Sequence, residues 1–309
     1  MSLLIIFNNK NAKPWKEYLQ EKLPEVNIEV YPNVADASKI TFALCWKPEE
    51  HILSKFPNLK VVQSAGASVE HITSTQNITK EMSISRIVDP KLSEDMFEYI
   101  LMGILAHLKD FNAYHINRSQ KIWEQKSYKV ISNTNVCVLG LGQIGTHVAE
   151  KLQTLGFKVS GWSKSKKKIE DVLCFHKENG LNQALSSSDI LINLLPLTEE
   201  TENILNLTNL CQLNKGAYLI NVGRGEHLVE SDLLQLLETE HLSGALLDVF
   251  RNEPLDSNHP FWQHEKIFIT PHVAALTNVK SASNIVIENY RNCDNEEKLI
   301  NLVSIQKGY

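Results

Sequence analysis

The sequence predicts an α/β protein with two domains, each built on a parallel sheet that helices cover. With 309 residues, the chain is long enough to form two hydrophobic cores. Apolar strand-like runs alternate with helix-like segments in the first third, and a second alternating series begins near residue 133. This alternation is typical of parallel sheets, because two parallel neighbours need a crossover connection between them.

The first series contains four strand-like runs, separated in two places by helix-like stretches. The runs are LLIIF (3–7), NIEVY (27–31), TFALCW (41–46) and LKVVQSAG (59–66). The helix-like stretches are PWKEYLQEKL (14–23) and PEEHILSKF (48–56). Residues 92–120 follow with apolar side chains at every third or fourth position, which predicts one continuous long helix. A helix of that length suits a junction between domains or packing against a second subunit.

The second series begins with a strand, a glycine-rich turn and a helix within residues 133–156. Further strand-like runs follow at 157–163, 189–196, 217–223, 244–250 and 266–272. The last helical pattern, residues 281–293, is a candidate to return to the first domain. The coarse organisation is therefore two α/β domains in one chain.

Composition narrows the class of protein. The net charge of −5 argues against a protein devoted to nucleic acid, which would carry a basic excess. The five cysteines are scattered without a C-x-x-C pair, which favours reduced thiols in a cytoplasmic protein. No His/Cys cluster has metal-site spacing, so no metal is expected. No apolar run approaches the roughly 18 residues of a membrane span, so no membrane association is expected.

The glycine-rich turn carries a dinucleotide-binding signal. Gly140, Gly142 and Gly145 form G-x-G-x-x-G between the buried strand NVCVL and a helical segment, which is the context that this motif requires. Gly140 permits the tight turn, Gly142 lets the backbone approach a pyrophosphate, and Gly145 allows the helix to pack closely on the strand. The pyrophosphate would lie at the positive N-terminus of the helix.

The end of the next strand predicts the cofactor preference. An NAD-specific site usually has an acid there, which accepts hydrogen bonds from the ribose 2′-OH. This chain has Ser163 followed by Lys164, and a hydroxyl donor and an ammonium suit a 2′-phosphate. NADP(H) is therefore the preferred cofactor and NAD(H) the alternative. A solvated loop that contributes a diffuse positive field is the favoured interpretation for each of Lys166, Lys167 and Lys168.

Three reactive side chains follow strands of the second series. Arg224, Glu253 and His272 each lie just beyond a strand end, where ligands bind in open α/β sheets. His272 can exchange a proton near neutral pH, and a carboxylate hydrogen-bonded to it stabilises the imidazolium. Arg224 can grip a carboxylate and polarise a carbonyl. A Ser-His-Asp hydrolase fits less well, because the chain has no G-x-S-x-G elbow.

These segments together resemble the D-isomer-specific 2-hydroxyacid dehydrogenases, and within them the glyoxylate/hydroxypyruvate reductase branch. The resemblance rests on LGLGQIG, LINLLPLTEET, GAYLINVGRGEHLVE, GALLDVFRNEPL and HEKIFITPHVAALT. It implies Arg224, Glu253 and His272 as the catalytic set. It also implies two Rossmann-like domains with parallel sheets, the first discontinuous, with the active site in the interdomain cleft. The expected limits are residues 1–98 with 275–309 for the substrate-binding domain and 99–274 for the dinucleotide-binding domain.

The resemblance also implies ligand contacts and a homodimer whose interface includes the long helix after Pro90. The substrate would be held by backbone N–H groups of Gly66, Ala67 and Ser68, and by Arg224, with Trp46 lining the pocket. Many relatives have a second glycine where this chain has Ser68. The implied cofactor contacts come from Gly140, Gly142, Gln143, Ile144, Gly145, Ser163, Lys164, Leu195, Pro196, Thr201, Val222, Gly223, Asp248, His272 and Ala274.

The expected activity is NADPH-dependent reduction of a small 2-oxo acid, such as glyoxylate or hydroxypyruvate, to the 2-hydroxy acid. Two alternatives stay open. An NADH-linked D-lactate or phosphoglycerate dehydrogenase is disfavoured by the missing acid at Ser163. A non-catalytic nucleotide-sensing protein on the same scaffold is disfavoured by the Arg/Glu/His set, because a sensor needs no proton donor.

Overall fold

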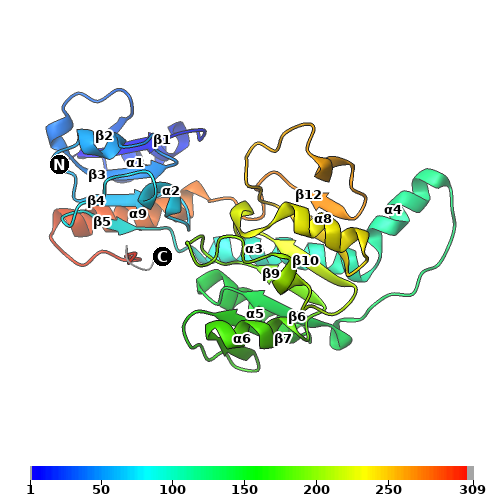
Figure 1. Cartoon of the computed structure of the whole chain (residues 1–309). Coiled ribbons are helices and arrows are strands. Elements are labelled where there is room, and N and C mark those ends of the chain that lie inside the picture. The colour runs from blue at the N-terminus through cyan, green and yellow to red at the C-terminus, as the bar shows by residue number, and fades with distance from the viewer. Residues whose placement is uncertain (1, 305–309) are drawn as a thin grey trace. The chain divides into compact units, whose positions relative to one another are not determined.

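The computed structural model describes residues 2–304, which form two compact units. The first unit comprises Met1–Leu92 and Thr277–Tyr309, and the second comprises Ser93–Leu276. The chain leaves the first unit after Leu92 and returns to it at Thr277 (Figure 1), so this unit is discontinuous, as the sequence analysis predicts. The division falls after Leu92 and Leu276, where the sequence predicts boundaries after residues 98 and 274.

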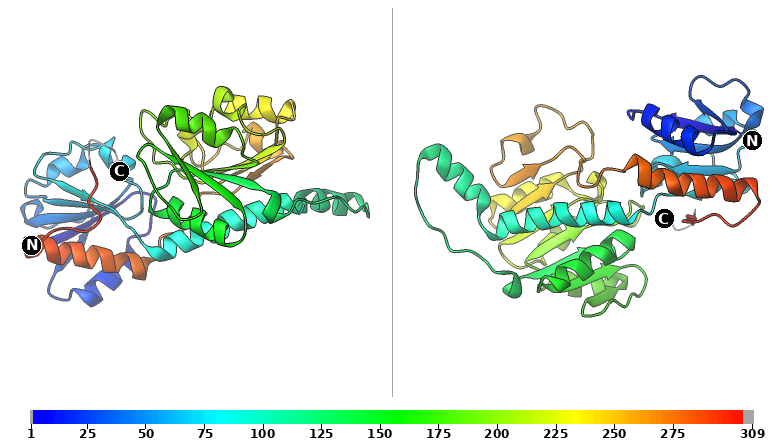
Figure 2. Two further views of the ribbon diagram at one scale, coloured as in Figure 1. Left: turned by 90° about the horizontal axis from the view of Figure 1, so that it is seen from below. Right: turned by 180° about the vertical axis from the view of Figure 1, so that it is seen from behind.

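The first unit is a five-stranded parallel sheet in the order β2-β1-β3-β4-β5. Its strands are β1 (Ser2–Phe7), β2 (Asn27–Val30), β3 (Ile40–Trp46), β4 (Val61–Ser64) and β5 (Ser83–Ser85). Alternate residues of β1 face opposite sides: Leu3 and Ile5 pack under the helices α1 (Lys13–Lys22) and α9 (Val279–Asp294), which lie side by side (Figure 2). Leu4 and Ile6 pack on the other face against η2 (Ile52–Lys55) and α2 (Glu70–Thr73).

Asn289 of α9 ties the last helix to the first sheet. Its side-chain amide, fully buried, donates to Gln63 Oε1 on β4 at 2.8 Å and to Ser85 Oγ on β5 at 2.9 Å. The Asn289 Oδ1 accepts a hydrogen bond from the backbone N–H of Ile300 at 2.8 Å. These bonds satisfy polar groups that would otherwise be costly in a buried position, and they fix the returning chain.

The second unit is a seven-stranded parallel sheet in the order β12-β11-β10-β9-β6-β7-β8. Its strands are β6 (Asn135–Leu139), β7 (Lys158–Ser163), β8 (Leu173–His176), β9 (Ile190–Asn193), β10 (Ala217–Asn221), β11 (Leu242–Leu247) and β12 (Ile267–Ile269). Helices α3 (Pro90–Leu108) and α5 (Gln143–Thr154) cover one face, and α6 (Lys177–Leu185) and α8 (Glu230–Glu238) cover the other. The strand order reverses between β6 and β9, which is where open α/β sheets bind ligands.

The predicted long helix is wrong in one respect, because it breaks at Asp110. That residue has φ 51° and ψ 34°, in the left-handed region, and separates α3 from α4 (Phe111–Gln120). The apolar face of α3 packs against the sheet as far as Leu108, whereas α4 has no buried residue. Figure 1 shows α4 pointing away from this sheet and the chain returning through the exposed segment 121–130.

Three further differences are local. Residues 48–56 form only the short 3₁₀ helix η2, because His51 adopts a left-handed backbone with φ 56°. The strands β5 and β8 were not predicted, since each is only three or four residues long. None of the described helices has the length and apolar content to cross a membrane.

Candidate active site

The glycine turn of the second unit has the geometry of a phosphate cradle. Gly140 has φ +98°, and a Cβ there would lie 2.6 Å from the Leu194 carbonyl oxygen. A Cβ on Gly145 would lie 1.8 Å from the carbonyl oxygen of Gly140, so only glycine permits this helix–strand approach. Gly142, at the N-terminus of α5, has nothing within 4 Å of a Cβ position. The predicted roles of Gly140 in the turn and Gly145 in packing are therefore confirmed, and open space lies before the helix.

The other residues expected at the cofactor follow the strands beside this turn. Gln143 is exposed and Ile144 half-buried in the first turn of α5. After β9, the Leu195 N–H donates to Asn193 Oδ1, and the Thr201 hydroxyl donates to the Pro196 carbonyl at 2.7 Å. Val222 and Gly223 are buried directly after β10. The structure thus gathers these residues at the carboxyl ends of β6, β9 and β10.

Ser163 and Lys164 lie at the carboxyl end of β7, the strand next to β6. Ser163 is 8% exposed, and its hydroxyl donates to the Ser165 carbonyl at 2.7 Å. The Lys164 ammonium forms an ion pair with Glu200 Oε1 at 2.7 Å, and both side chains are largely exposed. This pair was not predicted, because 36 residues separate its members. An exposed ion pair of this kind is weak, so an incoming phosphate can compete for the lysine.

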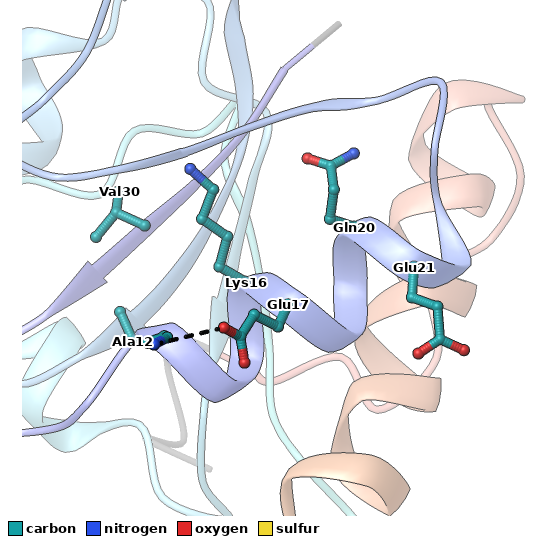
Figure 3. A pocket seen from close by; sticks show the side chains of 7 residues that line it. Ala12, Lys16, Glu17, Gln20, Glu21 and Val30 are labelled. Carbon is teal, nitrogen blue, oxygen red and sulfur yellow. Dashed lines mark ion pairs between the residues drawn. The ribbon is translucent and has the colours of Figure 1, made fainter.

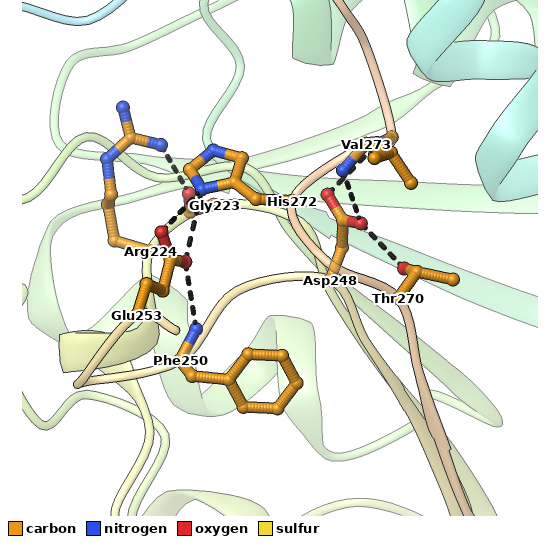
Figure 4. Close-up of polar contacts among 9 residues, drawn as sticks. Gly223, Arg224, Asp248, Phe250, Glu253, Thr270, His272 and Val273 are labelled. Atoms are coloured by element: carbon orange, nitrogen blue, oxygen red, sulfur yellow. Dashed lines mark hydrogen bonds and ion pairs between the residues drawn. The ribbon is translucent and has the colours of Figure 1, made fainter. Parts of the chain in front are cut away.

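His272 and Glu253 form a hydrogen-bonded pair (Figure 4). The His272 Nδ1 lies 2.9 Å from Glu253 Oε2 and 3.1 Å from Oε1, and the side chains are 37% and 24% exposed. The Phe250 N–H also donates to the Glu253 carboxylate. Within residues 2–304, the His272 Nε2 has no hydrogen-bond partner. Glu253 thus orients the ring and leaves Nε2 available to a ligand.

Asp248 holds the loop that carries His272. Its carboxylate accepts hydrogen bonds from the Thr270 hydroxyl at 2.6 Å and from the N–H groups of Val273 and Ala274 at 2.8 and 2.9 Å. Asp248 is 1% exposed, so this is a buried, fully bonded carboxylate. The family resemblance implies that Asp248 and Ala274 contact the cofactor. In the structure both residues take part in the hydrogen bonds that hold the His272 loop.

Arg224 follows β10 and lies beside the His272–Glu253 pair in Figure 4. Its Nη1 donates to the Gly223 carbonyl at 2.6 Å. A Cβ on the next residue, Gly225, would lie 1.9 Å from the carbonyl carbon of Phe250, so this loop packs directly on the loop that leads to Glu253. The three side chains expected to be catalytic are therefore brought together on adjacent loops.

A buried network beneath Arg224 was missed in the sequence. Asn193 and Asn221, at the ends of β9 and β10, are joined by a 2.9 Å hydrogen bond, and Asn193 also contacts His227 Nδ1 at 2.8 Å. The Asn221 amide donates to the Arg224 carbonyl. All three side chains are completely buried. The sequence signal that could have revealed this network is an asparagine at the end of each of two adjacent strands.

The first unit has its own cluster of expected residues. A Cβ on Gly66 would lie 2.6 Å from Trp46 Cζ3, so the indole edge rests on this glycine. The Gly66 N–H donates to Ser64 Oγ at 3.2 Å, whereas the N–H groups of Ala67 and Ser68 have no acceptor among the described residues. Arg86 braces the loop by donating to the Ala67 carbonyl. The loop therefore presents two free donors next to Trp46.

An open groove along α1 contains none of the expected site residues (Figure 3). It is lined by Ala12, Lys13, Lys16, Glu17, Gln20, Glu21 and Val30. Lys13 and Glu17 form an exposed ion pair of 3.8 Å there, an ordinary surface feature of a helix. Residues 2–304 also contain no group of three His, Cys, Asp or Glu side chains placed to hold a metal ion.

Comparisons with known proteins agree with this architecture. Residues 101–274 match the family described as D-isomer specific 2-hydroxyacid dehydrogenase, NAD binding domain. The chain is 37% identical over 304 residues to glyoxylate/hydroxypyruvate reductase A of Photorhabdus laumondii, covering 97% of each protein. It is 35% identical over 303 residues to the reductase of that name from Yersinia enterocolitica, covering 96% of each.

Solved structures give the same result. The D-isomer specific 2-hydroxyacid dehydrogenase of Xanthobacter autotrophicus, crystallised with NADPH and MES, is 32% identical with a TM-score of 0.95, covering 100% of this chain and 99% of that one. The NADPH-dependent glyoxylate/hydroxypyruvate reductase of Sinorhizobium meliloti, crystallised with NADP and sulfate, is 32% identical with a TM-score of 0.94 over the whole of both chains. This chain therefore belongs to the D-isomer specific 2-hydroxyacid dehydrogenases, a family of NAD(P)-dependent oxidoreductases.

Proposed function

We propose that the protein reduces a small 2-oxo acid, glyoxylate or hydroxypyruvate, to the 2-hydroxy acid with NADPH. The observation that carries the proposal is the His272–Glu253 pair, whose 2.9 Å bond leaves the histidine Nε2 open beside Arg224. A proton donor and a guanidinium are the groups that reduction of a carbonyl requires, because negative charge develops on its oxygen. The reductase names of the relatives from Photorhabdus and Yersinia support the substrate class.

The glycine turn fits a dinucleotide. Its open space at Gly142 lies before the N-terminus of α5, where backbone N–H groups and the helix dipole favour a pyrophosphate. We infer a preference for NADP(H), supported by Ser163 and Lys164 at the end of β7 and by the NADPH or NADP complexes of the Xanthobacter and Sinorhizobium proteins. NAD(H) remains the alternative.

Each side chain then has a defined task. The N–H groups of Ala67 and Ser68 bind the substrate carboxylate, and Gly66 shapes the loop rather than donating, since its N–H is held by Ser64. Arg224 binds the same carboxylate and polarises the 2-oxo group. His272 donates its proton from Nε2 to the developing alkoxide, while Glu253 stabilises the imidazolium. NADPH, when bound, supplies the hydride.

We also infer a homodimer in the cytoplasm. The helix α4 and segment 121–130 carry exposed apolar side chains, among them Phe111 at 68%, Trp123 at 100% and Tyr128 at 64% exposure. A concentration of large apolar groups on one projecting part of the chain is typical of a protein interface. The five cysteines are all free thiols, which suits a reducing compartment.

The test is NADPH oxidation, followed at 340 nm, with glyoxylate, hydroxypyruvate, pyruvate and phenylpyruvate, each repeated with NADH. We expect the highest kcat/KM for glyoxylate or hydroxypyruvate with NADPH. Higher kcat/KM with NADH and pyruvate would instead favour a D-lactate-type dehydrogenase. NADPH binding without turnover of any acid would favour a nucleotide sensor and contradict the proposal.

A further inference from the structure

Lys10 is a half-buried cation at the edge of the first sheet where the substrate loop lies. It follows β1, while Trp46 ends β3 and Gly66 follows β4. The strands β1, β3 and β4 are neighbours and parallel, so these three residues come from adjacent carboxyl ends. That edge of an open parallel sheet is where ligands bind.

Three aromatic rings hold the Lys10 ammonium. Its Nζ lies 4.4 Å from the ring centroid of Trp46, 5.5 Å from that of Trp15 and 5.9 Å from that of Phe7. Phe7 and Trp15 pack edge to face with their centroids 5.8 Å apart, and Trp15 is 1% exposed. The rings are therefore fixed by the core, and their negative faces position the cation by cation–π attraction.

Among residues 2–304, the Lys10 ammonium has no anionic counterpart. Within the described part of the chain, no carboxylate lies within ion-pair distance of Lys10. Burial lowers its pKa to about 8, so the group is poorly solvated yet still charged at neutral pH. A partly desolvated cation without a carboxylate binds a ligand oxygen more strongly than a surface lysine does.

Trp46 lies between Lys10 and the substrate loop. Lys10 is over the face of the indole, whereas Gly66 touches the Cζ3 edge of the same ring. His71 packs on the indole as well, with ring centroids 4.9 Å apart. The ammonium and the substrate loop therefore share the indole of Trp46, so the two can contact different ends of one small acid.

We propose that Lys10 is a specificity-determining residue that donates a hydrogen bond to an oxygen at the distal end of the 2-oxo acid. This inference rests on the proposed function. It predicts preference for acids with a hydroxyl or carboxylate at C3 over acids that end in a methyl group. A methyl group would shield the ammonium from water without accepting a hydrogen bond from it. Leaving a desolvated donor without an acceptor costs more binding free energy than the loss of one contact.

Hydroxypyruvate and pyruvate form a matched pair, because they differ only in the C3 hydroxyl. We would measure kcat/KM for both acids with saturating NADPH in the wild type, in Lys10→Met and in Lys10→Arg. Lys10→Met keeps an unbranched side chain without charge, and Lys10→Arg keeps charge and donors. The control is Lys13→Met, because Lys13 is 79% exposed in the groove along α1.

The expected result is a ratio of hydroxypyruvate to pyruvate kcat/KM that favours hydroxypyruvate in the wild type and falls by about tenfold or more in Lys10→Met. Lys10→Arg should retain most of the ratio, and Lys13→Met all of it. Melting temperature and NADPH affinity are measured for each variant, since a purely structural cation–π role would lower stability and leave the ratio unchanged.

Two outcomes overturn the inference. A ratio within twofold of the wild type in Lys10→Met, with NADPH binding intact, removes Lys10 from specificity while the proposed function stands. A wild type whose kcat/KM is higher for pyruvate than for hydroxypyruvate would likewise exclude Lys10 as a specificity determinant. If the wild type reduces no 2-oxo acid at all, the proposed function fails, and the inference falls with it.

Discussion

The backbone N–H of His272 donates to the carbonyl oxygen of Asp248 at 2.8 Å, and the Asp248 carboxylate binds the chain on both sides of that histidine. His272 itself has φ 55°, a left-handed conformation that a non-glycine residue adopts at some cost. The buried aspartate offsets that cost by fixing Thr270 before the histidine and Val273 after it.

Asp248→Asn should therefore damage both stability and turnover. The new NH₂ group would face backbone donors, so we expect the free energy of unfolding to fall by about 2–4 kcal/mol. We expect kcat to fall at least about tenfold, because the His272 loop loses its anchor. Chemical denaturation and steady-state kinetics measure the two effects. Asp171→Asn, at an exposed position in the same unit, is the control. Unaltered kcat in Asp248→Asn would contradict the anchoring role.

His272→Gln should lower kcat by about 10²–10⁴-fold while NADPH affinity changes little, because the proton donor is lost and the cofactor cradle is intact. Glu253→Gln should lower kcat less, since the amide still positions the ring but cannot stabilise the imidazolium. Steady-state kinetics and NADPH fluorescence titration separate the two quantities. Near-normal turnover in His272→Gln would remove this histidine from the mechanism.

The end of β7 should control the choice of cofactor. In Ser163→Asp with Lys164→Ala, the ratio of kcat/KM for NADPH to that for NADH should fall by about tenfold or more, because an acid repels the 2′-phosphate. Glu200→Gln should shift the ratio the other way, because it releases Lys164 from its 2.7 Å ion pair. Replacement of Lys166, Lys167 and Lys168 by serine is the control. An unchanged NADPH-to-NADH ratio in the double variant would contradict the interpretation of Ser163 and Lys164 as a 2′-phosphate site.

The exposed apolar side chains of α4 and segment 121–130 should mediate self-association. We expect light scattering after size exclusion to give the mass of two chains for the wild type. Phe111→Ser with Trp123→Ser should shift the mass to one chain, because the exposed aromatic area drives association. Leu173→Ser, at a 62% exposed position on β8, is the control. A monomeric wild type at micromolar concentration would contradict the homodimer.

His107 should make the second unit sensitive to acid. Its ring stacks on Tyr218 with centroids 4.3 Å apart, and burial lowers its pKa to about 4. Above pH 6.5 the His107 ring is neutral in both the folded and the unfolded state, so its titration does not change the free energy of unfolding. As the pH falls from 6.5 towards 4, only the unfolded state binds the proton, and stability is lost.

At pH 5 the loss should be on the order of 1–2 kcal/mol. His107→Phe keeps the stacked ring without a titrating group and should flatten the pH dependence of unfolding between pH 7 and 5. Urea denaturation at several pH values measures this. An equally steep loss in the variant would show that other groups are responsible.

Much of the fold could be predicted from sequence because its signals are local. The apolar runs became strands with nearly the expected bounds, and the glycines of the turn occupy the conformations that their spacing predicts. The break at Asp110 could not be found this way, since the helical pattern continues across it and only loss of burial ends α3.

The parts of the candidate site that could be predicted are those where the type and position of a residue suggest its role. Contacts between residues far apart in the sequence could not be predicted. Arg224, Glu253 and His272 stand out because charged groups at successive strand ends are unusual. The Lys164–Glu200 pair, the polar contact between Asn193 and His227 and the aromatic setting of Lys10 depend on tertiary contacts. Sequence spacing carries no information on such contacts.

The interrupted first unit has a consequence for synthesis on the ribosome. The sheet face under α1 needs α9, which is made only after the entire second unit. The second unit is continuous, so it can fold while the first still exposes an incomplete core. Nascent chains would expose part of that face until translation ends, and a stop codon before residue 277 would leave a folded nucleotide-binding unit attached to a sheet that lacks α9.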